Sequence, residues 1–388
     1  MKKTISIKKD KTWITIFCIT VFLVLFGILM VYSASYYYAE KTYNNPFFFL
    51  IKQAIGFFIG LLAMIFLSKC NYHNLRKFSL ISLVIGYILL ILVFVPGVGV
   101  SNYGATRWIR LPGFTIQSSE IAKFCFVLFS ASYLAKEFQN VKTFKGILPV
   151  MLAGGFMCLL IILEPNMSIT MCVGLIMIVM LIVGGMSFKH LIMIAIPALI
   201  LACALIIIEP YRFDRLMAFI NPWANPKGEG YQLIQSFFSI SDGGLFGVGL
   251  FNSRQKYLFL PFAESDFIFS VIAEEFGLVG CAVILLLYFV LIVCGIKVAI
   301  KAKDRFGCYL ATGITTVVAV QTLLNVSVVS GLIPPTGLPL PFISAGSTSI
   351  VVFMAAIGIL LNISSNEKIT EINCNFNNKF FKKNKSHI

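Results

Sequence analysis

The sequence has few charged residues, and acidic residues are the scarcest of them. Only 12% of its 388 residues are charged, and its 16 Asp and Glu are outnumbered by 31 Lys and Arg. Soluble globular domains carry about 25% charged residues, so an ordinary soluble enzyme is excluded. Hydrophobic residues make up 59% of the chain, which is typical of a polytopic membrane protein.

Paired cysteines and histidine-rich clusters are also missing from the sequence. The ten cysteines are scattered singly, most of them inside apolar runs, and no two have the spacing of a metal knuckle. We interpret them as small apolar packing residues without a disulfide framework. The three histidines, His73, His190 and His387, all fall in segments that we expect on the cytoplasmic side, which excludes a histidine-based metal site or general base on the outer face.

Long apolar runs dominate the chain. Runs long enough to cross a bilayer occupy residues 13–34, 48–68, 78–97, 119–135, 146–164, 167–186, 190–208, 266–296, 306–330 and 347–364. They predict an all-α, polytopic membrane protein with about ten transmembrane helices. We expect one membrane domain over residues 13–364, between a basic N-terminus (1–12) and a basic tail (365–388). The first run lacks a small-residue cleavage site, which favours a retained anchor over a signal peptide.

The distribution of charge predicts the orientation. The N-terminus, alternate loops and C-terminal tail together hold 21 of the 31 Lys and Arg and 5 of the 16 Asp and Glu, a net of +16; the remaining 10 basic and 11 acidic residues sum to −1. The positive-inside rule therefore places both termini in the cytoplasm. The basic tail then faces solvent or lipid headgroups, and a nucleic-acid partner is not needed to explain it.

Four outer loops follow from this orientation, at about residues 98–118, 164–168, 209–265 and 334–346. A loop of more than fifty residues is usually functional or disordered, and the aromatic content of 209–265 favours short helices at the membrane interface. The prolines in 334–346 prevent a continuous helix there. Non-helical backbone near membrane depth is tolerated only where it is buried in protein or lines a cavity, so we expect a re-entrant or cavity-lining segment here, close to Asp266.

Three carboxylates stand out in the eighth apolar run. Asp266 lies at the start of this run, and Glu274 and Glu275 follow about two helical turns later. A carboxylate at or inside the membrane is costly, which makes each one a candidate for function. The alternatives are that Asp266 only caps the helix and that Glu274 and Glu275 form hydrogen bonds within the bundle.

Several cations are expected beside these carboxylates at the outer surface. Glu120 and Lys123 lie three residues apart and can form an ion pair at the start of a helix. Guanidinium and ammonium groups around one or two carboxylates suit an anionic, phosphate-bearing substrate, although snorkelling to lipid headgroups is an alternative. The basic residues of the outer loops are Arg107, Arg110, Arg212, Arg215, Lys227, Arg254 and Lys256.

Ordered motifs along residues 14–364 resemble the SEDS family of cell-wall proteins, which includes FtsW, RodA and SpoVE. These motifs are Gly104-Ala-Thr-Arg107-Trp108-Ile109, Gln117-Ser-Ser-Glu120-Ile-Ala-Lys123, Tyr211-Arg-Phe-Asp-Arg215, Gly230-Tyr-Gln-Leu-Ile-Gln-Ser236, Leu260-Pro-Phe-Ala-Glu-Ser-Asp266 and Thr336-Gly-Leu-Pro-Leu-Pro-Phe-Ile-Ser344. The segments 219–226 and 253–256 are most similar to the FtsW/SpoVE branch.

The resemblance implies a peptidoglycan glycosyltransferase with ten helices. Such an enzyme polymerises lipid II into glycan strands at the outer face of the cytoplasmic membrane, during division or sporulation, and inverts the linkage. Its implied partners are a class B penicillin-binding protein and other membrane proteins of the division septum. The alternatives are a lipid II flippase and a non-catalytic scaffold. A flippase would place charges along both leaflets, whereas the inner-leaflet stretches here are nearly free of charge.

The resemblance also implies site residues. The essential aspartate of the family matches Asp266, which would be the general base, and its glutamate and lysine match Glu120 and Lys123. A divalent cation, Mg²⁺ or Mn²⁺, is expected with Asp266 and Glu120 as candidate ligands. The residues expected to bind pyrophosphate or sugar are Arg107, Arg110, Arg212, Arg215, Lys256, Gln235 and Ser344. The chain departs from the family pattern at Phe262, Glu264, Asn166 and Ala345, and Asn166 removes one outer carboxylate.

Overall fold

The computed structural model describes residues 11–102, 105–111, 114–208 and 210–365, and each of the ten apolar runs forms a helix within them. The helices are α1 (Thr12–Tyr43), α2 (Phe48–Lys69), α4 (Ser79–Leu92), α5 (Ser118–Lys136), α6 (Phe144–Leu163), α7 (Met167–Gly184), α8 (Phe188–Ile208), α11 (Ile268–Lys301), α12 (Arg305–Val329) and α13 (Ser347–Ser365). Seven of them, α1, α2, α6, α7, α11, α12 and α13, are long and apolar enough to cross a membrane. The protein is therefore a multi-pass helical membrane protein, and the count of ten spans stays a prediction.

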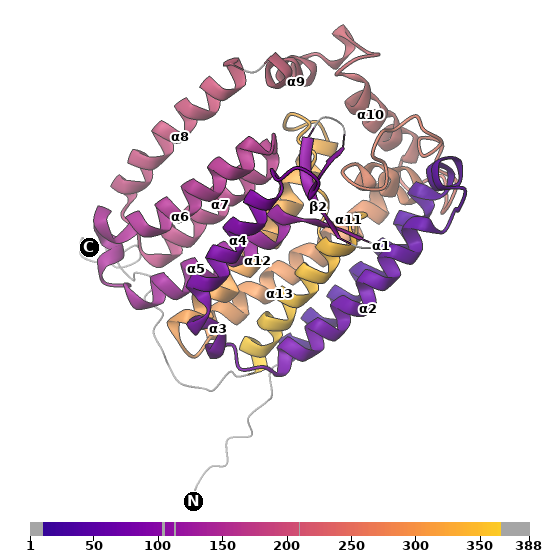
Figure 1. The fold of residues 1–388 in the computed structure, drawn as a ribbon. Helices are drawn as coiled ribbons and strands as arrows, with labels where there is room; N and C mark the ends of the chain where they lie inside the picture. The colour runs from indigo at the N-terminus through magenta and orange to yellow at the C-terminus, as the bar shows by residue number, and fades with distance from the viewer. Residues whose placement is uncertain (1–10, 103–104, 112–113, 209, 366–388) are drawn as a thin grey trace, which may run out of the picture.

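The helices run side by side in one bundle, with α8 at its edge (Figure 1). Helix α2 packs along α13, α4 along α5, and α11 along α12. The polar residues of the candidate site lie at one end of this bundle, where the chain leaves the helices for its longer loops.

Loops predicted to share a side of the membrane do meet in space. At one end of the bundle, Asn362 donates from Nδ2 to the Ser68 carbonyl at 2.7 Å and accepts from the Tyr72 amide at 3.1 Å. At the other end, Thr348 donates from Oγ1 to the Thr115 carbonyl at 2.9 Å. These contacts agree with the grouping of loops that the charge distribution predicts.

The first long outer loop forms a small sheet that the all-α prediction missed. Strands β1 (Gly99–Asn102), β2 (Ala105–Leu111) and β3 (Phe114–Gln117) pair antiparallel in the order β1-β2-β3. Trp108 pairs with Gln117, and Ile109 pairs with Gly99 on the other side. Because β3 leads directly into α5, the sheet holds Arg107 of β2 near the start of the helix that carries Glu120.

The loop from 209 to 265 contains the short helices that its composition predicts. They are α9 (Pro210–Ile220), η2 (Pro222–Ala224) and α10 (Tyr231–Gly243), and α10 packs along α11. On the other side of the bundle, α3 (His73–Lys77) and η1 (Asn140–Lys142) occupy short connections.

Helix α11 is broken at Gly277, in the part of the helix closest to Asp266 in the sequence. Gly277 has φ 66° and ψ −167°, which no residue of a regular helix adopts. The loop 244–249 fills the break: Val248 donates to the Glu274 carbonyl at 2.9 Å, and Leu278 donates to the Gly244 carbonyl at 3.0 Å. The backbone groups freed by the break are thus satisfied by another part of the protein, as a membrane helix requires.

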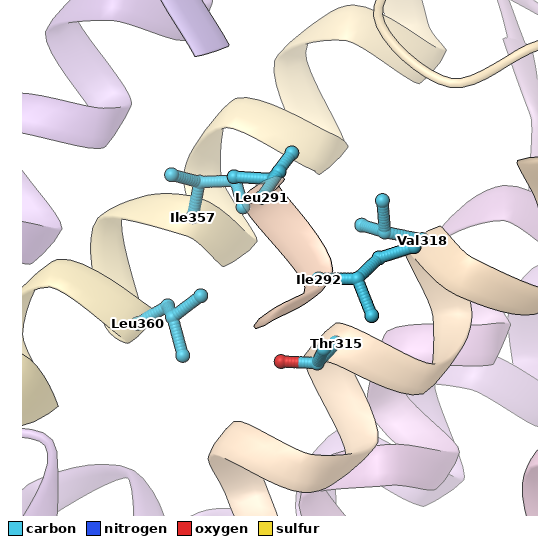
Figure 2. Close-up of a pocket in the computed structure, with 6 residues that line it drawn as sticks. All are labelled: Leu291, Ile292, Thr315, Val318, Ile357 and Leu360. Atoms are coloured by element: carbon cyan, nitrogen blue, oxygen red, sulfur yellow. The ribbon is translucent and has the colours of Figure 1, made fainter. Parts of the chain in front are cut away.

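One small cavity lies between α11, α12 and α13 (Figure 2). Its volume is about 10 Å³, which is at the lower limit for a single water molecule. The only polar side chain that lines it, Thr315, already donates to the Ala311 carbonyl at 2.7 Å. We therefore interpret the cavity as a packing gap. Its lining residues are Leu291, Ile292, Thr315, Val318, Ile357 and Leu360.

Cys18, Cys70, Cys125, Cys158, Cys172 and Cys281 form no disulfide bond.

Candidate active site at the outer end of the bundle

Asp266 lies in the turn that leads into α11. The N-cap position of that helix is Phe267, and no side chain caps it, so the capping alternative for Asp266 is not what the structure shows. The main-chain carbonyl of Asp266 accepts from Asn325 Nδ2 at 2.8 Å, and the same amide donates to the Leu338 carbonyl at 2.6 Å. Asn325 on α12 therefore fixes the backbone of Asp266 and leaves its carboxylate available for other interactions.

The proline-rich segment 334–346 contacts this turn, as predicted. Gly337 has φ 68°, and a Cβ atom placed there would lie 3.1 Å from Asp266 Oδ2. Ser344 donates from Oγ to the Ser265 carbonyl at 2.6 Å, and the Ala345 amide donates to the Glu264 carbonyl at 2.8 Å. A glycine is required at 337 because the backbone adopts a left-handed conformation and approaches a carboxylate closely.

Two arginines act on the Asp266 carboxylate from different elements. Burial raises the pKa of Asp266 from 3.8 to about 6, and the positive charges of Arg107 and Arg215 oppose this rise. Arg215 on α9 donates to the Pro335 carbonyl at 3.1 Å, and Arg107 on β2 donates to the Pro165 carbonyl. The result is a carboxylate that is ionised at pH 7 yet basic enough to accept a proton.

The Glu120–Lys123 ion pair forms as predicted and is fully buried. Lys123 Nζ lies 2.9 Å from Glu120 Oε1, and both side chains are 0% exposed. Lys123 also donates to Gln321 Oε1 on α12, and Gln321 Nε2 donates to the Pro339 carbonyl at 2.9 Å. A chain of polar contacts therefore joins the pair on α5 to the segment beside Asp266, with Ser349 adding a 3.5 Å contact to Glu120 Oε2.

Gln321 and Asn325 are site residues that the sequence analysis missed. They lie four residues apart on α12, so they share one face of that helix, and both are buried. Two amides at this spacing in an apolar run indicate a polar contact on that face of the helix, and this signal was visible in the sequence. The NH2 groups of buried amides need acceptors, and here the acceptors are the carbonyls of the proline-rich segment and of Asp266.

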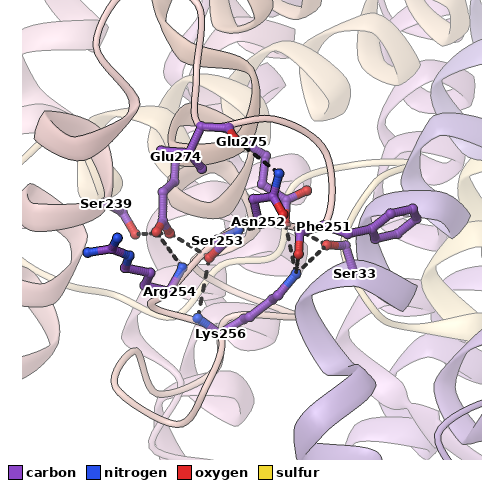
Figure 3. Close-up of polar contacts among 10 residues, drawn as sticks. Ser33, Ser239, Phe251, Asn252, Ser253, Arg254, Lys256, Glu274 and Glu275 are labelled. Atoms are coloured by element: carbon purple, nitrogen blue, oxygen red, sulfur yellow. Dashed lines mark hydrogen bonds and ion pairs between the residues drawn. The ribbon is translucent and has the colours of Figure 1, made fainter.

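Lys256 lies in a different cluster, together with Glu275 and Ser33 (Figure 3). Its Nζ is 3.2 Å from Glu275 Oε1, donates to the Phe251 carbonyl at 2.6 Å, and lies 3.2 Å from Ser33 Oγ. Ser33 in turn donates to Glu275 Oε1 at 2.6 Å. The ammonium group predicted to bind substrate is thus already paired inside the protein.

Glu274 is hydrogen-bonded to the loop that precedes Lys256. It accepts from the Arg254 amide at 2.6 Å, from Ser253 Oγ and, at 3.3 Å, from Ser239 Oγ on α10. Both glutamates of α11 therefore form hydrogen bonds within the protein, which was the structural alternative for them. We define residues 33, 239, 251, 253, 254, 256, 274 and 275 as the buried glutamate network.

The other predicted substrate residues have varied surroundings. Arg110 on β2 is exposed, Gln235 on α10 is partly buried, and Ser344 donates to Ser265 and accepts from the Leu340 amide at 2.7 Å. Arg212 belongs to α9, but its side chain lies outside the described residues.

A further carboxyl group, Glu164, lies close to Arg107 and was not predicted as a site residue. It follows α6 directly, is 0% exposed, and lies 3.4 Å from Ser118 Oγ. Burial raises its pKa from 4.5 to about 8, against the opposing effects of Ser118 and Arg107.

The described residues include no group of three or more His, Cys, Asp or Glu side chains that could hold a metal ion. Asp266 fits a cation that takes most of its ligands from elsewhere, since Mg²⁺ is commonly bound by one or two carboxylates together with water and substrate phosphates. Glu120 already binds Lys123, so it fits less well.

These features define a multi-pass helical membrane protein with a polar, cation-rich site at one end of its bundle. Comparison with known proteins identifies the family. The profile of the FtsW/RodA/SpoVE family, described as "Cell cycle protein", matches residues 14–369, and the chain belongs to that family.

Two relatives and one solved structure illustrate the similarity. Stage V sporulation protein E of Bacillus subtilis is 38% identical over 359 residues, which cover 92% of this chain and 98% of that protein. A "Probable peptidoglycan glycosyltransferase FtsW" of Geobacter metallireducens is 38% identical over 358 residues, covering 92% and 96%. A chain from "Structural coordination of polymerization and crosslinking by a peptidoglycan synthase complex" has a TM-score of 0.76 at 25% identity and covers 94% of this chain and 100% of its own.

Proposed function

We propose that this protein is a peptidoglycan glycosyltransferase that polymerises lipid II into glycan strands at the outer face of the cytoplasmic membrane, at the septum of a dividing or sporulating cell. The observation that carries the proposal is the partly buried carboxylate of Asp266, on which the charges of Arg107 and Arg215 act. The names of the relatives with 38% identity support the same activity.

The chemistry follows from these groups. A hydroxyl of the acceptor sugar attacks the anomeric carbon of the donor, the bond to the prenyl pyrophosphate breaks, and the linkage inverts. Asp266 accepts the proton of the attacking hydroxyl, a contribution worth about 10²–10⁴ in rate. Arg107 and Arg215 lie where they can stabilise the negative charge that develops on the leaving pyrophosphate.

A divalent cation, Mg²⁺ or Mn²⁺, fits the same reaction. Bound by Asp266 and by the phosphates of the substrate, it would supply further positive charge at the leaving group. A chelator should then slow polymerisation by the wild-type protein, and added Mg²⁺ or Mn²⁺ should restore it.

The partner that we propose is a class B penicillin-binding protein, with other division proteins of the membrane around it. The solved chain with a TM-score of 0.76 comes from a complex in which polymerization and crosslinking are coordinated. Glycan strands need crosslinks to form a wall, so the polymerase is best assayed together with its transpeptidase.

Asp266→Asn tests the function directly. The variant removes the proton acceptor and the negative charge, so polymerisation by the complex should fall by about 10²-fold or more. The wild-type rate should also fall as the pH drops below about 6, where Asp266 becomes protonated. Asp242→Asn, at an exposed position on α10, is the matched control and should polymerise normally.

The length of the glycan strands and the amount of each variant in the membrane are measured together in this assay. Normal strands from Asp266→Asn, at normal protein level, would contradict the proposal and favour a flippase or a scaffold instead.

A further inference from the structure

Glu164 is a buried carboxyl group whose environment the proposed reaction does not yet explain. It lies in the turn between α6 and α7, and its side chain is 0% exposed. Its best hydrogen bond, from Ser118 Oγ to Oε1, is long at 3.4 Å, and Oε2 is buried with no hydrogen-bond partner among the described residues. An ionised carboxylate in such a place would be poorly satisfied.

Arg107 connects this group to Asp266. The arginine is attached to the turn itself, since it donates from Nε to the Glu164 carbonyl at 3.4 Å and from a terminal nitrogen to the Pro165 carbonyl. Its charge acts on both the Glu164 and the Asp266 carboxyl groups. Because the charge of one guanidinium acts on both carboxyl groups, the protonation of one group affects what the guanidinium can do for the other.

We propose that Glu164 is a positioning residue for Arg107: in its neutral form it leaves the guanidinium to Asp266 and the substrate pyrophosphate, and in its ionised form it competes for that guanidinium. This inference rests on the proposed glycosyltransferase function. Ionisation of Glu164 would also add a negative charge near the site that an anionic substrate must enter, which opposes binding.

The other charged groups around Glu164 do not alter this picture. The start of α5 contributes Ser118, which is uncharged, and the buried Glu120–Lys123 pair, whose charges cancel. At the start of α7, Asn166 is neutral and uses its side chain to accept from the Ile169 amide. Among the described residues, Arg107 on β2 is therefore the cation whose charge opposes the rise in the Glu164 pKa.

The direction of the pH effect follows from burial. Because burial raises the pKa of Glu164 to about 8, the group is neutral at pH 7 and becomes charged above pH 8. Asp266 has the opposite requirement, since it must be ionised, which holds above about pH 6. The plot of polymerisation rate against pH should therefore have two limbs. On the acidic limb the rate falls as Asp266 becomes protonated, and on the alkaline limb it falls as Glu164 ionises.

The test compares the pH dependence of lipid II polymerisation by the complex for wild type and Glu164→Gln. The wild-type rate should fall about tenfold between pH 7 and pH 9, as expected for a group that ionises between them. Glutamine cannot ionise, so in the variant the ratio of the rate at pH 7 to the rate at pH 9 should approach one. Glu229→Gln, at an exposed position of the outer loop, is the matched control and should keep the tenfold fall.

Two results would overturn the inference: a wild-type rate without an alkaline limb near pH 8, or an alkaline limb that persists in Glu164→Gln. If that variant does not reach the membrane, Glu164→Ala removes the same titrating group and is measured in its place. The fall of the rate below about pH 6 separates the proposed role of Glu164 from the proposed glycosyltransferase function. If it remains while the alkaline limb is absent, only the role of Glu164 is wrong; a normal rate from Asp266→Asn would instead remove the proposed function.

Discussion

At the residue scale, the buried glutamate network shows how charged side chains are tolerated inside this protein. Lys256 and Glu275 are 5% and 0% exposed at their side chains and lie 3.2 Å apart. Removing a charge from water costs several kcal/mol, so such a pair is stable only with good geometry and additional hydrogen bonds. Ser33 and the Phe251 carbonyl supply those bonds and join α1 and the long outer loop to α11.

Lys256→Met should therefore destabilise the protein. Loss of the ammonium leaves Glu275 buried without its counter-charge, a change that costs about 3–5 kcal/mol for a buried pair. The double variant Lys256→Met, Glu275→Gln should recover much of the loss, because no uncompensated charge remains. Thermal unfolding of the purified protein measures both effects, with Lys227→Met at an exposed position as the control.

Measuring polymerisation by the same variants also decides the predicted role of Lys256 in substrate binding. If Lys256→Met retained full thermal stability while polymerisation was lost, the residue would act on the substrate, and our structural interpretation of the pair would be wrong.

At the scale of elements, the break in α11 connects the long outer loop to the helix that follows Asp266. Loop 244–249 bonds to the backbone of α11 on both sides of Gly277. A Cβ atom at Gly277 would lie 2.4 Å from the Gly247 backbone nitrogen. The loop and the outer part of α11 therefore behave as one unit, and the turn that carries Asp266 is attached to it.

Gly277→Ala tests that unit. Alanine is strained at φ 66° and would also push loop 244–249 away from the helix, so we expect a loss of about 1–3 kcal/mol from the backbone conformation alone. Gly155→Ala is the matched control, because a Cβ atom at Gly155 in α6 meets nothing within 4 Å. That change should be neutral or stabilising by up to about 1 kcal/mol.

Thermal unfolding and polymerisation are measured for both glycine variants. Equal stability of Gly277→Ala and wild type would show that the loop does not depend on the break.

At the scale of the whole molecule, the charge asymmetry and the contacts between loops agree. The segments assigned to the cytoplasm carry a net charge of +16. Within the described residues, the end of α2 and the connection that follows it contact the last turns of α13 at one end of the bundle, whereas the loop that forms the sheet contacts the start of α13 at the other end. The contacts establish which loops share an end, and the charge predicts which end faces the cytoplasm.

Cysteine labelling tests this orientation. In a cysteine-free background, Lys227→Cys should react with an impermeant thiol reagent added to intact cells, and Lys303→Cys should react only after the membrane is opened. The opposite pattern would overturn the orientation and, with it, a site at the outer face.

Much of the architecture follows from local properties of the chain. The hydrophobic effect and the length of each apolar run favour a helix there, so a helix was predicted, and is found, at each of the ten runs. The predicted ends differ from the observed ones by up to nine residues: the run 13–34 lies in α1, Thr12–Tyr43, and the run 266–296 is α11, Ile268–Lys301. The spacing of Glu120 and Lys123 likewise predicted their ion pair, because residues three apart share a helix face.

The roles of most other polar residues depended on contacts between distant segments. Asp266 and Lys256 were both expected at the substrate site, yet Lys256 pairs with Glu275, and Asp266 is held by Asn325 on α12. The small sheet and the burial of Glu164 beside Arg107 were not apparent either. Hydrophobicity is a property of each segment, so it is readable along the chain; the partner of a buried polar group is chosen by packing, and only the tertiary structure supplies it.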